Sequence, residues 1–109
     1  SALYFMRYVG VPSAAPGTLY IGRQTILGVD VGGARYVGTY SETRGRMNVD
    51  IMLLMPKGGV LITGANAPAG SKYKLSGEWP VEPADGFTHR MYFDGRPMQV
   101  GFERIGFVP

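Results

Sequence analysis

The side chains that could carry chemistry are few in this chain and lie far apart. His89 is the single histidine, and it has no partner at the spacing of a metal-binding or metalloprotease motif. The eight carboxylates form no close pair on one face of an expected strand, which argues against general acid–base catalysis. There are no cysteines, so a thiol nucleophile, a thiolate metal site and a disulfide scaffold are excluded. We therefore expect a protein that is not an enzyme and that uses no metal and no cofactor.

Two positions require a choice between a structural and a functional role. Asp30 ends an expected strand just before Gly32 and Gly33, where a carboxylate commonly accepts hydrogen bonds from turn amides. We favour that role over catalysis. No helix follows these glycines to receive a phosphate, so a nucleotide-binding loop is not indicated. His89 shares a strand face with apolar residues, and we expect it to be buried and hydrogen-bonded to the backbone.

Glycine and proline restrict the elements that can position these residues. The longest stretch without either residue is Arg46–Met55, and Pro56 follows it directly. Helices average about 11–12 residues and disfavour both residues in their interior. The chain is therefore expected to be all-β, and its length fits a single domain over residues 1–109.

The strands are short and separated by turn signals. The segment Lys72–Trp79 alternates between apolar and polar residues, as a half-buried strand does. Turns that suit hairpins occur at Gly32-Gly33, Arg44-Gly45, Gly58-Gly59 and Asp94-Gly95. Successive hairpins form an antiparallel up-and-down meander, and its closure into a barrel of about eight strands would remove exposed edges. The expected strands are Leu3–Val9, Thr18–Gly22, Thr25–Asp30, Tyr36–Ser41, Met47–Met55, Val60–Thr63, Lys72–Trp79, Phe87–Phe93 and Met98–Ile105.

The segment Met47–Met55 is apolar on both faces. Alternate residues from Val49 onward form one face, while Met52 and Leu54 make the opposite face apolar as well. Such a strand must be covered, either by a loop or terminus of the same chain or by another molecule. We favour a homodimer interface at Met52 and Leu54, because exposed apolar patches commonly mark contact sites.

Short motifs in the first half of the chain resemble the GrlR-like family, negative regulators of type III secretion. The resemblance implies a small lipocalin-like (calycin-like) antiparallel barrel that acts by binding a protein partner, commonly as a dimer, with a regulatory role. Val29 stands where a second glycine is usual in the family, and the second half of the chain matches mainly by strand pattern. The segments that carry the resemblance are Leu3-Tyr4-Phe5, Gly17–Ile21, Ile26–Asp30 and Tyr36–Tyr40, with Asp94–Pro97 and Phe102–Ile105 similar to the tails of bacterial members.

The resemblance also singles out the turn after Tyr40. In the prototype regulators an acidic loop at this place engages a transcriptional activator. The matching residues here are Glu42, Arg44 and Arg46, so the loop is mixed to basic. We expect it to be either a recognition loop for an acidic partner surface or a plain solvated hairpin.

A second function class is a lipocalin-like carrier that holds a small apolar ligand inside the barrel. Small barrels are commonly filled by side chains, but some hold one small ligand. The candidates for lining such a cavity are taken from the inward faces of two expected strands. They are Tyr73, Leu75, Trp79, Phe87, His89 and Met91.

Composition bears on partners and location. The net charge is +3, but the arginines are scattered and lack the dense aromatic–basic interleaving of an RNA-binding platform, so binding to nucleic acid is disfavoured. No apolar run approaches the roughly 20 residues of a membrane span, and no signal-peptide pattern is present. We expect a cytoplasmic protein without a membrane span.

Overall fold

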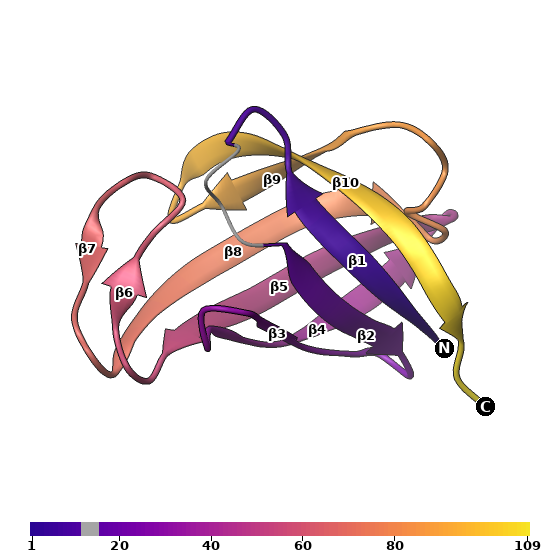
Figure 1. The fold of residues 1–109 in the computed structure, drawn as a ribbon. Helices are drawn as coiled ribbons and strands as arrows, with labels where there is room; N and C mark the ends of the chain where they lie inside the picture. Colours follow the sequence, from indigo (N-terminus) through magenta and orange to yellow (C-terminus); the bar gives the residue numbers. More distant parts are fainter. Residues whose placement is uncertain (12–15) are drawn as a thin grey trace.

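The computed structural model describes residues 1–11 and 16–109, and this part of the chain is all-β (Figure 1). Eight strands close into an antiparallel barrel in the order β1-β10-β9-β8-β5-β4-β3-β2, and β6 pairs only with β7. The predicted barrel formed by a meander is therefore confirmed. The strands are β1 Ala2–Tyr8, β2 Gly17–Gly22, β3 Thr25–Asp30, β4 Arg35–Thr43, β5 Arg46–Met55, β6 Gly59–Val60, β7 Asn66–Ala67, β8 Ser71–Pro80, β9 His89–Phe93 and β10 Arg96–Phe107.

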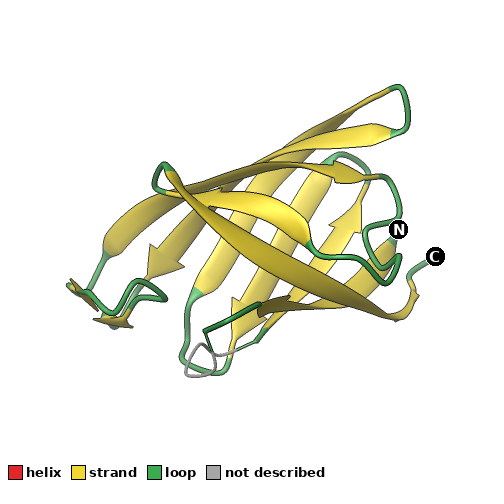
Figure 2. Ribbon diagram, turned by 90° about the horizontal axis from the view of Figure 1, so that it is seen from above, coloured by secondary structure: helices red, strands yellow, loops and turns green. Residues whose placement is uncertain are grey.

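The meander skips two strands where it passes from β5 to β8. These two long strands pair along their whole length, and residues 56–70 between them leave the barrel. Figure 2 shows this segment, with its two short strands, lying beyond one end of the barrel. The expected strand Val60–Thr63 is thus not a barrel strand: only Gly59 and Val60 pair, with Ala67 and Asn66. Positive φ angles at Gly58 and Gly59 turn the chain away from the line of β5.

A dense core fills most of the barrel interior. Trp79 is fully buried, and its indole N–H donates a hydrogen bond of 3.1 Å to the carbonyl oxygen of Arg90. Its ring meets that of Phe102 edge-on, with centroids 4.7 Å apart. An ideal Cβ at Gly77 would lie 2.7 Å from the indole nitrogen, so the missing side chain makes room for Trp79. The core is therefore closed by side chains around the single tryptophan.

Glycines that face inward bring strands close together. At Gly38 in β4, an added Cβ would collide with the carbonyl oxygen of Asp50 and lie 2.8 Å from the Cα of Ile51. At Gly28 in β3, it would collide with the carbonyl oxygen of Thr18. Glycine inside a strand commonly marks such a close backbone approach. The inward glycines here allow a tight bend and do not open space for a ligand.

The hairpin turns at Arg44-Gly45 and Asp94-Gly95 are as expected. In each turn both residues have positive φ, as two-residue turns of type I′ require. Arg23 and Gln24 adopt the same conformation between β2 and β3, although neither is glycine. Separately, none of the described residues forms a helix that is long and apolar enough to cross a membrane.

Candidate ligand-binding site

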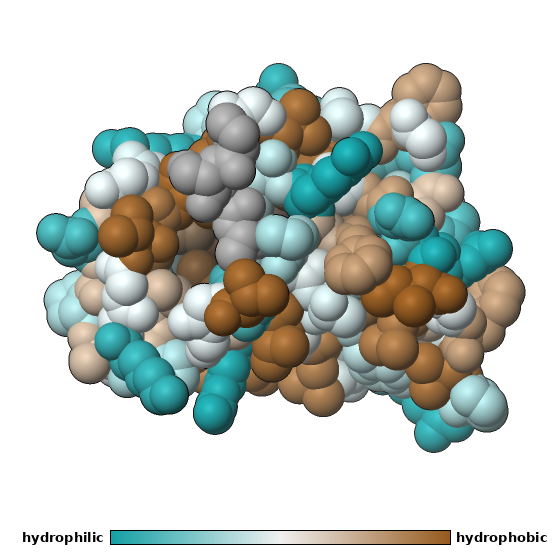
Figure 3. All heavy atoms as spheres, in the orientation of Figure 1, coloured by the Kyte–Doolittle hydropathy of each residue, from teal (hydrophilic) through white to brown (hydrophobic). Residues whose placement is uncertain are grey.

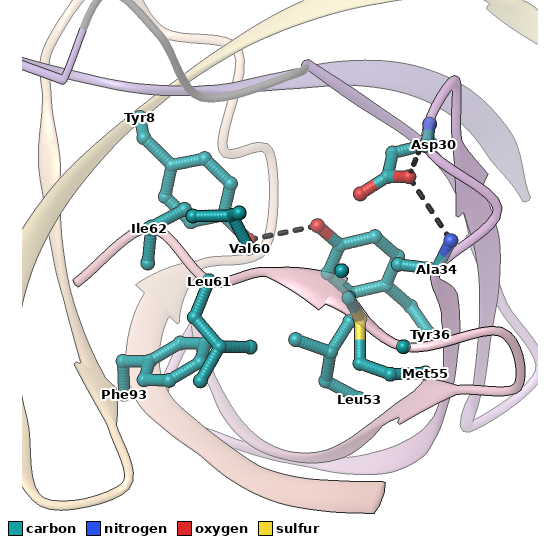
Figure 4. Close-up of a pocket in the computed structure, with 13 residues that line it drawn as sticks. Tyr8, Asp30, Ala34, Tyr36, Leu53, Met55, Val60, Leu61, Ile62 and Phe93 are labelled. Atoms are coloured by element: carbon teal, nitrogen blue, oxygen red, sulfur yellow. Dashed lines mark hydrogen bonds between the residues drawn. The ribbon is translucent and has the colours of Figure 1, made fainter. Parts of the chain in front are cut away.

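A cavity of about 350 Å³ lies at the end of the barrel from which residues 56–70 emerge (Figure 4). We call these residues the mouth flap. The walls come from the ends of several barrel strands and from the first half of the mouth flap. The lining residues are Tyr8, Asp30, Gly32, Ala34, Tyr36, Leu53, Met55, Gly58, Gly59, Val60, Leu61, Ile62 and Phe93.

Two tyrosine hydroxyls form the polar centre of this cavity. Tyr8 is the last residue of β1 and Tyr36 the second residue of β4, and their hydroxyl oxygens are 2.8 Å apart. Both side chains are buried. The pair holds two hydroxyl protons, and the hydrogen bond between the tyrosines uses one of them. Within the part of the chain that the structure describes, the other proton has no recorded acceptor. The pair can therefore donate to a ligand.

Burial keeps both tyrosines in their neutral form. It is the main cause that raises the pKa of Tyr36 from 10.0 to about 12, and it raises the pKa of Tyr8 further still. The negative charge of Asp30 raises the pKa of both hydroxyls as well. At neutral pH the pair is thus a source of hydrogen bonds and carries no charge.

Asp30 ends β3 at the rim of the same cavity. Its Oδ1 accepts hydrogen bonds from the amides of Gly32 (2.8 Å) and Ala34 (3.1 Å). The prediction that Asp30 holds the turn amides is confirmed. Figure 4 shows the second carboxylate oxygen on the side that faces the two tyrosines. Asp30 therefore has a structural role through one oxygen and leaves the other for the cavity.

The mouth flap is tied to the barrel at its base, where Ser71 at the start of β8 also donates from its amide and hydroxyl to the Pro68 carbonyl oxygen. The amides of Gly58 and Gly70, near its two ends, both donate to the carbonyl oxygen of Met55, at 3.1 and 2.8 Å. Leu61 extends from the flap and is buried between the first cavity and a second one of about 280 Å³. The second cavity is lined by Leu61, Thr63, Ala65, Asn66, Tyr73, Phe93, Asp94 and Arg96. Leu61 thus separates two openings of the barrel mouth.

Most of the residues that strand parity predicted to line a cavity do not lie at the barrel mouth. Leu75, Trp79 and Met91 are fully buried in the closed core and line neither cavity, while Tyr73 lines the second. Phe87 is 73% exposed, so its predicted inward position is wrong. The reason is local: its amide donates to Asp85 Oδ1 in a turn, and β9 begins only at His89.

His89 has a side-chain partner instead of the backbone partner expected for it. Its Nε2 lies 2.9 Å from Asp85 Oδ1, and the ring is largely buried. The amide of Phe87 and then His89 lower the pKa of Asp85. These contacts hold the loop before β9, and His89 does not line either cavity. The contacts give His89 a structural role.

The outer side of β5 belongs to a wider apolar face. Met52 pairs with Val37 of β4, which pairs with Leu27 of β3, and all three side chains point outward. Leu54 lies beside them and is half-buried. Figure 3 shows apolar side chains gathered over the region of β2 and β3. The outward apolar residues of β3, β4 and β5 that are between 40% and 56% exposed are named here the outer apolar face: Leu27, Val29, Val37 and Met52.

The charged turn between β4 and β5 is only partly free. Arg46 lies at the start of β5, where its Nε is 3.4 Å from Glu78 Oε1 and its Nη2 donates to the Glu78 carbonyl oxygen at 3.0 Å. Glu42 and Arg44 are exposed, and Arg44 occupies the turn itself. The structure therefore ties one of the three predicted recognition residues to β8.

Sequence reasoning overlooked the two tyrosines of the mouth. Tyr8 stood at an inward position at the end of the first strand, which is a usable signal for a residue at a barrel mouth. Comparisons with protein-family models, with curated proteins and with solved structures gave no match. The resemblance to GrlR-like regulators therefore stays a prediction.

Proposed function

We propose that this chain is a non-enzymatic binding protein that holds a small, mainly apolar ligand with one polar group at the barrel mouth. The observation that carries this proposal is the cavity around the Tyr8–Tyr36 pair. Small-molecule sites are commonly about 300–1,000 Å³ in volume and have apolar walls with a few placed polar groups. Leu53, Met55 and Phe93 supply such walls. The cavity lies near the lower limit of this range, which favours a small ligand.

The titratable groups of the site support binding over catalysis. A general acid or base works best when its pKa lies near the working pH. Burial moves the pKa values of Tyr8 and Tyr36 further from neutrality. Asp30 uses one carboxylate oxygen to hold its turn. These groups suit a site that recognises a ligand and leaves it unchanged.

Straight-chain alcohols test the proposal, because they combine an apolar chain with an uncharged hydroxyl. We expect 1-octanol to shift the backbone amide resonances of Ala34 and Leu61 saturably in nuclear magnetic resonance titrations. Leu61→Ala should weaken binding about fivefold, because it removes part of the apolar wall, at about 0.8 kcal/mol per buried methylene.

Phe87→Ala is the matched control for that titration. Its ring is exposed and lies outside the cavity, so the affinity for 1-octanol should not change. Shifts that do not saturate, or that centre on residues away from the mouth, would contradict the proposed site. An equal loss of affinity in both variants would also count against it.

A second candidate function is protein binding through the outer apolar face, as the resemblance to GrlR-like regulators implies. Monomeric soluble proteins rarely expose contiguous apolar patches larger than a few hundred Å². Met52, Val37 and Leu27 form a continuous exposed row over three strands. A second copy of the chain could cover this row with the same row of its own, as two-fold symmetric interfaces do. In that function Arg44 would remain free to address an acidic partner.

Replacing Met52 and Leu54 by charged residues tests whether the chain forms this dimer. We expect the unmodified protein to be dimeric at tens of micromolar in light scattering, and the double variant Met52→Glu, Leu54→Glu to be a folded monomer. Val81→Glu is the control, because Val81 is similarly exposed but follows β8 beyond the outer apolar face. A monomeric unmodified protein would rule out this interface.

A further inference from the structure

The charge of the mouth cavity comes from one residue. Among the thirteen residues that line it, Asp30 alone carries a formal charge at neutral pH. The other lining residues are apolar, are glycines or are the two neutral tyrosines. Among the described residues that line the cavity, no lysine or arginine offsets the charge of Asp30 near the Tyr8–Tyr36 pair.

The position of Asp30 directs its negative charge toward the two tyrosines. Its Oδ1 is held by the amides of Gly32 and Ala34, which fixes the carboxylate at the rim. Its other oxygen is on the side that faces the tyrosines (Figure 4). The charge of Asp30 also raises the pKa of both tyrosines, so its field reaches the hydroxyl pair. The carboxylate and the hydroxyls thus act on the same small volume.

We propose that the mouth cavity selects ligands that carry a protonated amine on an apolar body, over carboxylic acid anions of the same size. This inference rests on the proposed function, because it names the class of ligand for the same site. An ammonium group can donate to Asp30 and to a tyrosine oxygen together, while its chain lies against Leu53 and Phe93. A carboxylate would lie beside Asp30 and be repelled by it.

Three probes of equal chain length separate charge from shape: n-octylamine, 1-octanol and octanoate. At neutral pH the amine is protonated and octanoate is ionised, as the corresponding side-chain groups are. In amide titrations of the unmodified protein, we expect the amine to bind at least about tenfold more tightly than octanoate, with the alcohol between them. Equal affinities for the amine and octanoate would overturn the inference.

Asp30→Asn is the decisive variant. The asparagine Oδ1 can still accept hydrogen bonds from the amides of Gly32 and Ala34, so the turn is retained while the charge is lost. We expect the amine and octanoate to bind this variant within about twofold of each other. Asp94→Asn is the control, because it removes one negative charge at the second cavity. The first cavity of this variant should still prefer the amine over octanoate. An unchanged preference in Asp30→Asn would contradict the role of Asp30.

Ionic strength provides a test that needs no variant. Added salt screens the attraction between an ammonium ion and a partly exposed carboxylate, so it should weaken amine binding and leave 1-octanol binding unchanged. If 1-octanol binds saturably but the amine has no advantage, the inference fails and the proposed function stands. If none of the three probes binds at the mouth, the proposed function itself fails.

Discussion

Replacing Gly38 by alanine should remove much of the stability of the barrel. The added Cβ would collide with the backbone of β5 at Asp50 and Ile51, and a backbone cannot move aside as the end of a flexible side chain can. We expect a loss of about 3 kcal/mol in the free energy of unfolding, at the upper end of the usual cost of overpacking, because the clash is with backbone atoms. Whole domains are stable by only about 5–15 kcal/mol.

Urea unfolding followed by circular dichroism measures this loss. Gly106→Ala is the matched control, because an added Cβ at Gly106 in β10 meets nothing within 4 Å. The control should unfold within about 0.5 kcal/mol of the unmodified protein. A Gly38→Ala variant as stable as this control would show that β4 and β5 can separate without cost.

The barrel should also lose stability in alkali, between pH 10 and about 12. The pKa of Tyr36 rises from 10.0 to about 12 in the folded state, mainly by burial. A raised folded pKa contributes stability that is complete below the unfolded pKa and is lost as the pH rises through the folded value. For Tyr36 this amounts to about 3 kcal/mol, at 1.36 kcal/mol per pKa unit. Tyr8 adds a loss of the same sign.

Tyrosinate absorbance and thermal melting test this prediction together. In the folded protein the pKa of Tyr4 is also about 12, so Tyr4, Tyr8 and Tyr36 should stay neutral well above pH 10 while the barrel is folded. In urea they should ionise near pH 10. Tyr36→Phe removes one of these groups and should flatten the fall of melting temperature with pH. Ionisation of every tyrosine near pH 10 without unfolding would contradict the buried hydroxyl pair.

The barrel could be predicted because its signals are local. The alternation in Lys72–Trp79 placed Trp79 inward, and the spacing of glycine and proline excluded helices. The same reasoning was wrong at Phe87, because a turn at Asp85 interrupts the alternation before β9 begins. It was also wrong for Val60–Thr63, since a short apolar run does not reveal whether it will pair inside a barrel or outside it.

The site was harder to predict because it depends on closure of the barrel. The turn role of Asp30 was correct, since its partners are two and four residues away. Its nearness to Tyr8 and Tyr36 was not predicted. Those two tyrosines are 28 residues apart in sequence and meet only when β1 and β4 are placed around the same mouth. No local pattern contains that information.

The attachment of the mouth flap at its base, around the Met55 carbonyl, separates the shape of the entrance from the folding of the barrel. Because the amides of Gly58 and Gly70 meet at this one acceptor, the loop between them leaves and re-enters the barrel at the same place. The register of β5 against β8 is unbroken up to the pair of Met55 and Ser71, where the loop begins. Insertions or substitutions inside the loop would therefore reshape the entrance while the framework that determines folding stays the same. In evolution or in protein engineering, changes in the mouth flap could therefore alter which ligands enter the barrel without altering how the barrel strands fold.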